Sequence, residues 1–96
     1  MKNITEPDAK KILSDRDHRN IVTVTFPKGH VMDTHEHPFD ADIVIVSGSI
    51  KIVVDDKEYN LASGDEFQLG AEIEHSEFIG EDGVTLVSAR PEIKEN

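Results

Sequence analysis

Residues 43–54 read IVIVSGSIKIVV, two short runs of apolar and β-branched residues on either side of Ser47-Gly48-Ser49. Runs of this length and composition, bounded by turn-forming residues, are typical of buried β-strands. We therefore predict one strand over 43–46 and another over 50–54, joined by a turn at the glycine.

More short strands are predicted on both sides of this stretch, at 21–26, 58–61, 66–69, 75–79 and 84–89. Their regular spacing, with no helical periodicity after residue 20, favours a β-sandwich or closed barrel over alternating strands and helices. We expect Gly80–Gly83 to form a hairpin loop that pairs Ile79 with Val84 and His75 with Ser88.

The start of the chain predicts one short helix. Thr5 can cap it, Pro7 is tolerated in the first turn, and Asp8 stands at capping-box spacing. The weak apolar face that follows ends at about Ser14.

Composition narrows the classes of partner. The 96 residues include 20 acidic and 10 basic side chains, a formal net charge of −10, and no cysteine. Binding to nucleic acid or anionic membranes relies on Lys and Arg, and the longest basic run here is Lys10-Lys11. We expect neither partner, no disulfide and no thiolate metal site. With no apolar leader and no run of about 20 apolar residues, we also expect a cytoplasmic protein.

Two sequence features could together hold a metal ion. His35 and His37 stand two positions apart, so on a strand they face the same side and can converge on one ion. His75 and Glu77 repeat this spacing on a second predicted strand. If the strands are neighbours, three imidazoles and a carboxylate meet, a set that suits Fe, Mn, Ni, Zn or Cu. The competing interpretation is ordinary surface and strand histidines.

Both histidine segments lie in patterns that resemble a known family. Gly29, five residues, His35-x-His37 and later Gly48 resemble the first cupin motif. Gly64-Asp65, then Gly70-x-Glu72-x-x-His75, resemble the second. The resemblance implies a cupin-type double-stranded β-helix, a jelly-roll barrel, preceded by the short helix. Its interior is expected to be apolar, from Ile43, Ile45, Ile52 and Leu86.

On this interpretation the chain is a single cupin domain over 1–96. It comprises a helical or loop-like segment at 1–20, the barrel at 21–90 and a tail at 91–96.

The chain departs from the cupin pattern at the usual ligand glutamate, where Ala41 stands. Asp42 would face away by strict strand alternation, unless a bulge after Pro38 turned it inward. We prefer Glu77 as the replacement, either as fourth ligand or as general base, with water as the other candidate for the fourth position. Alternatively, Glu77 pairs with Arg90.

The remaining site predictions concern the small-molecule ligand. Arg90 could anchor a substrate carboxylate, and Phe39 is expected to line the barrel mouth or the core and to contact substrate. The cupin resemblance implies a metal-dependent oxygenase or isomerase, or else a non-catalytic module that binds a ligand or metal. Val22, Val24 and Phe26 give an early strand one apolar face, which, if uncovered, would favour a homodimer.

Overall fold

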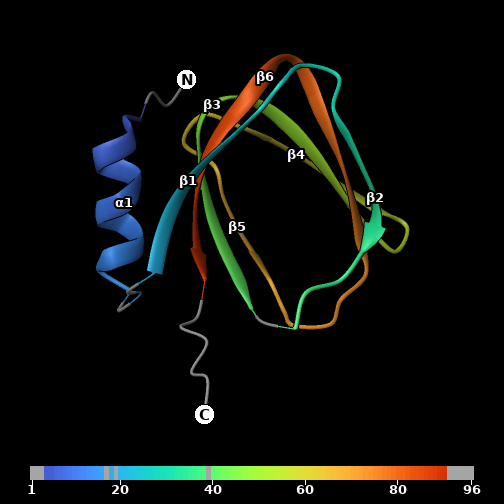
Figure 1. Cartoon of the computed structure of the whole chain (residues 1–96), viewed down its shortest axis with the longest axis horizontal. Helices are drawn as coiled ribbons and strands as arrows, with labels where there is room; N and C mark the ends of the chain where they lie inside the picture. Colours follow the sequence, from blue (N-terminus) through green and yellow to red (C-terminus); the bar gives the residue numbers. More distant parts are fainter. Residues whose placement is uncertain (1–3, 17, 19, 39, 91–96) are drawn as a thin grey trace.

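Two long strands organise the structure, a computed structural model. β3 (Ala41–Val54) and β6 (His75–Arg90) run antiparallel along their whole length, from the pair Asp42–Ala89 to the pair Val54–His75. Both strands bend near the middle, so that their halves belong to two facing walls of a barrel (Figure 1).

The structure describes residues 4–16, 18, 20–38 and 40–90, with Arg90 described by its backbone alone. The other elements are α1 (Glu6–Ser14), β1 (Asn20–Phe26), β2 (Val31–His35), β4 (Lys57–Ala62) and β5 (Glu66–Leu69).

Each wall takes half of β3, half of β6 and two shorter strands. In the first wall, β1 pairs with β6 from Val84 onward and β5 pairs with β3 at its start. Because α1 packs on its outer side, we call it the helix wall. In the second, β2 pairs with the start of β6 and β4 pairs with the end of β3. We call this the histidine wall, since it carries His35 and His75. The predicted all-β jelly-roll architecture with one short helix is confirmed.

The barrel interior is filled by apolar side chains from both walls. Its buried members are Ile43, Ile45, Ile50, Ile52, Leu61, Ile79, Val84 and Leu86. All four residues predicted for the interior are among them. Burial of these side chains is the main favourable contribution to folding, about 25 cal/mol for each Å² removed from water.

Helix α1 begins and ends as its sequence predicts. The Thr5 side chain accepts a hydrogen bond from the Asp8 backbone, and the Asp8 side chain bonds back to Thr5. This reciprocal cap satisfies amide groups that have no partner inside the helix. Ala9 and Leu13, one turn apart, are fully buried against the outer face of the helix wall.

Two predicted turns are wrong, because both segments lie inside continuous strands. Residues 47–49 belong to β3 and residues 80–83 to β6, at the corner where the barrel bends. The register shifts on both sides of Ser47 and Gly48, as in a β-bulge, so Ile45 and Ile50 both point inward. The hairpin pairing of His75 with Ser88 is therefore also wrong.

The apolar face of β1 is not uncovered. Val24 and Phe26 line the barrel interior, while Thr23 on the opposite face hydrogen-bonds to Glu6 of the helix. The covered face of β1 therefore gives no support to the expected homodimer, which stays a prediction. Among the described residues, no helix has the length and apolar character needed to cross a membrane.

Candidate metal centre

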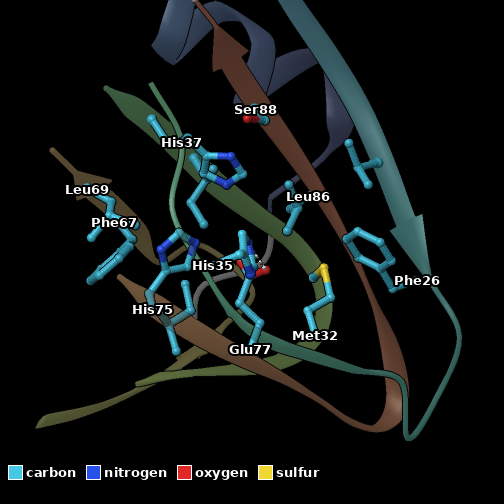
Figure 2. Close-up of a pocket in the computed structure, with 14 residues that line it drawn as sticks. Phe26, Met32, His35, His37, Phe67, Leu69, His75, Glu77, Leu86 and Ser88 are labelled. Atoms are coloured by element: carbon cyan, nitrogen blue, oxygen red, sulfur yellow. Dashed lines mark ion pairs between the residues drawn. The ribbon is translucent and has the colours of Figure 1, made fainter. Parts of the chain in front are cut away.

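Three imidazoles gather on the histidine wall (Figure 2). His35 ends β2 and lies opposite His75 at the start of β6, and His37 follows two residues beyond β2. One ring nitrogen from each of the three lies within 4.8 Å of those of the other two. The two sequence segments therefore meet in space, although His37 lies just outside the strand that was expected to hold it.

The backbone orients two of these rings. His35 Nδ1 lies 2.7 Å from the carbonyl oxygen of Asp33, and His75 Nδ1 lies 3.0 Å from that of Ile73. A carbonyl oxygen can only accept a hydrogen bond, so each Nδ1 carries the proton and donates it. In the neutral imidazole Nε2 then keeps its lone pair, the form in which histidine binds a metal.

This donor set fits a divalent transition metal. Two nitrogens bound to one ion at about 2.1 Å in tetrahedral geometry lie about 3.4 Å apart, so the rings would approach one another by about 1 Å to share an ion. Three imidazoles are ligands common to Zn, Fe, Ni and Cu sites.

Glu77 brings a carboxylate to the same group. Its Oε2 lies 3.7 Å from His35 Nε2, and its side chain is 16% exposed. Burial raises the pKa of the Glu77 carboxyl group above its ordinary value. The neighbouring His75, His35 and His30 act in the opposite direction and reduce the rise. A carboxyl group that is largely shielded from water in this way is suited to accepting and releasing protons.

A cavity of about 130 Å³ opens beside the four side chains. It is lined by Val24, Phe26, Met32, His35, His37, Ala41, Ile43, Ile52, Phe67, Leu69, His75, Glu77, Leu86 and Ser88. Apolar cavities of about 150 Å³ hold a molecule the size of benzene. The enclosed part of a ligand is therefore compact, with one polar end at the histidines.

A family model described as the cupin domain matches residues 22–87. The chain belongs to the cupin family. Solved structures agree with this assignment. A cupin-2 domain protein from Shewanella frigidimarina is 18% identical, over 75% of this chain and 69% of that one, with a TM-score of 0.66.

Two further structural relatives of this cupin have individual names. KdgF from a Halomonas species is 22% identical over 77% of this chain and 69% of its own, with a TM-score of 0.63. The DMSP lyase DddQ from Ruegeria pomeroyi is 19% identical over 79% of this chain but only 40% of its own, with a TM-score of 0.67. At these identities the likeness concerns the fold. No curated protein matches the chain.

Asp42 does not join the histidines of this cupin. It is buried on the outer face of the helix wall, where Arg16 donates hydrogen bonds of 2.7 and 2.9 Å to its two carboxylate oxygens. Gln68 donates a third of 3.1 Å, and His18 Nε2 lies 2.9 Å away. Ala41 lines the cavity instead. Strict alternation thus holds before the corner, and the alternative in which a bulge turns Asp42 inward is wrong.

The network around Asp42 could not be read from the sequence, because Arg16 stands 26 positions away. Burial alone would raise the pKa of Asp42. The hydrogen bonds from Arg16, Gln68 and His18 outweigh burial and hold the pKa below its ordinary value. Arg16 also contacts Glu66 of β5, so the network ties the end of the helix to two strands.

Two predicted ligand contacts cannot be placed. Phe39 lies outside the described residues, and only the backbone of Arg90 is described, paired with Asn20 of β1. Contact of either side chain with substrate stays a prediction, as does the pairing of Glu77 with Arg90.

Proposed function

We propose that this cupin binds one divalent transition-metal ion through His35, His37 and His75, and that it catalyses a proton transfer on a compact small molecule. Glu77 is the group that accepts and returns the proton. The observation that carries the proposal is the half-buried Glu77 carboxylate at the wall of the cavity, with Oε2 3.7 Å from His35 Nε2.

The roles of the groups follow from their chemistry. A bound divalent ion would supply Lewis acidity, which polarises an oxygen of the substrate. Glu77 takes a proton from the bound molecule at a carboxylate oxygen and delivers it back at a neighbouring position. Its carboxylate lies at the cavity wall beside the histidines, within reach of a molecule bound there. The apolar walls exclude water and hold the rest of the molecule.

This assignment favours an isomerase over an oxygenase. An isomerisation through an enol-type species requires a group that accepts a proton and returns it, and the Glu77 carboxylate lies at the cavity wall to do so. The alternative of a non-catalytic binding module fits less well. Three imidazole donors leave positions on the ion for a substrate, which suits chemistry more than storage.

Metal content tests the proposal directly. Protein purified without an affinity tag or added metal should contain about one divalent ion per chain by elemental analysis. Removing the ion with a chelator should lower the unfolding temperature, because the ion binds the native state alone. Less than about 0.1 ion per chain, with no rise in unfolding temperature on adding Zn, Mn, Fe, Ni or Cu, would contradict a metal site.

Two carboxylates in this cupin should respond in opposite ways to amide replacement. Glu77→Gln removes a half-buried charge beside the histidines, so we expect about tenfold weaker metal binding and a metal-free protein more stable by about 1 kcal/mol. Asp42→Asn weakens the bond to Arg16, so we expect a loss of about 2 kcal/mol with metal affinity nearly unchanged. Metal titration and urea unfolding of both variants check this pair. If Asp42→Asn were the variant that lost metal, the assignment of Glu77 would be wrong.

The contribution of Asp42 should also depend on pH. Its pKa is lower in the folded than in the unfolded chain, where it is near 3.8, so folding favours the charged form. The stabilisation is therefore complete above that value and is lost as the pH falls through the folded-state pKa. The stability difference between wild type and Asp42→Asn should be full at about pH 6 and should shrink in strong acid. A difference independent of pH would exclude the ionised network as its cause.

A further inference from the structure

One polar side chain at the cavity has no part in the metal centre. Ser88 lies on the helix wall in β6, with Ile43 as its cross-strand partner, and its residue is 7% exposed. In β6, His75 lies four residues before Ile79 and Ser88 lies four residues after Val84, so the two are equally far from the corner. They belong to the two facing walls. Ser88 thus lines the same cavity as the three histidines, but from the helix wall (Figure 2).

The Ser88 hydroxyl is open to the cavity. Among the described residues it takes part in no side-chain hydrogen bond. Ser63, by contrast, donates its hydroxyl hydrogen to a backbone carbonyl oxygen. In the same part of the chain, no side-chain nitrogen or oxygen sealed from solvent lacks a partner. The Ser88 oxygen is thus exposed to the space that a ligand would fill.

On its own wall, the cavity-lining neighbours of this hydroxyl are apolar, and the other polar lining residues are the three histidines and Glu77. Ile43, Leu86 and Val24 line the cavity on the same wall, and the rings of His35 and His75 bond to backbone carbonyls. A hydroxyl beside apolar groups is unfavourable unless it finds a hydrogen-bond partner. Alanine would satisfy the packing here, so the fold does not require the serine oxygen.

We propose that Ser88 is a specificity-determining residue, which hydrogen-bonds a second polar group of the ligand. The inference rests on the proposed function and deepens it. The ligand is a compact bifunctional molecule, with a metal-binding oxygen group at one end, a short apolar segment, and a hydroxyl or carbonyl group at the other. A site built to hydrogen-bond a ligand in this way discriminates against analogues without the polar group.

Matched hydroxamic acids test this inference with the zinc-loaded protein. The hydroxamate group serves as the metal-binding end, and each alkyl hydroxamate of a graded series is compared with its ω-hydroxy analogue of the same length. By calorimetry, wild type should prefer the hydroxylated probe about fivefold at one length, the usual effect of one neutral hydrogen bond. Ser88→Ala should lose this preference. Ser76→Ala, next to His75 but not among the cavity-lining residues, should keep it.

The unfolding temperature separates this role from a structural one. Ser88→Ala should unfold at no lower temperature than wild type, since no protein hydrogen bond is lost. A clear fall in unfolding temperature, no preference at any probe length in wild type, or a preference that survives in Ser88→Ala would each overturn the inference. If zinc and alkyl hydroxamates bind normally in those cases, the proposed function stands. If no zinc binds, both fall together.

Discussion

Replacing His37 by alanine is expected to weaken divalent-metal binding by about 100-fold or more while the fold stays intact. Removing groups that merely orient a metal ligand typically costs 10- to 100-fold, and loss of a ligand itself should cost at least as much. His37 lies beyond the end of β2 and is half-buried, so no strand pairing depends on its side chain. Competition titrations against a chromogenic chelator measure the affinity, and circular dichroism checks the fold.

His30→Ala is the matched control for this prediction. His30 is exposed and stacks on Phe26 with ring centroids 5.4 Å apart, and it is not among the clustered histidines. We expect its replacement to change metal affinity by less than about twofold, because His30 supplies no ligand atom and has the smallest effect on Glu77 of the three histidines near it. Equal losses in both variants, or none in His37→Ala, would show that the ion is held elsewhere.

The largest loss of stability is expected from Gly48→Ala, at about 3 kcal/mol or more. Gly48 has φ of +76°, a backbone conformation that costs other residues roughly 1–2 kcal/mol. A Cβ at this position would lie 2.0 Å from the carbonyl oxygen of Gly83, which the pairing of β3 with β6 holds in place. The corner would have to open to admit a methyl group. Urea unfolding measures the loss.

Gly29→Ala separates the two causes. Gly29 has φ of +73°, but a Cβ there would meet nothing within 4 Å. It should therefore show the backbone cost alone, about 1 kcal/mol. If both variants lost the same stability, the close approach of Gly83 would play no part at the corner.

Much of the fold could be predicted because its signals are local. The cap formed by Thr5 and Asp8 involves residues three positions apart, and it set the start of the helix correctly. Alternation along 43–45 likewise placed Ile43 and Ile45 inside and Asp42 outside. A side chain two positions away on a strand faces the same side wherever the strand lies, so these inferences needed no partner.

The prediction of the histidine cluster combined local and long-range information. The spacing of His35 and His37 is local, whereas their meeting with His75 depends on the pairing of β2 with β6. The family resemblance supplied that pairing in advance. It did not indicate an acidic group to stand in for the glutamate missing at Ala41, since Glu77, the carboxylate found beside the histidines, comes from another strand.

By itself, the sequence determined the helix with its cap, most of the strand segments, the inward faces of the strands before the corner, and the candidate metal ligands. The tertiary structure alone decided that residues 47–49 and 80–83 are corners rather than turns, that Asp42 pairs with Arg16, and that Ser88 lines the same cavity as His75. Each of these depends on residues at least 13 positions apart, where one strand fixes the shape of another. Periodicity reports which side a residue faces, but only the packed barrel determines what stands opposite.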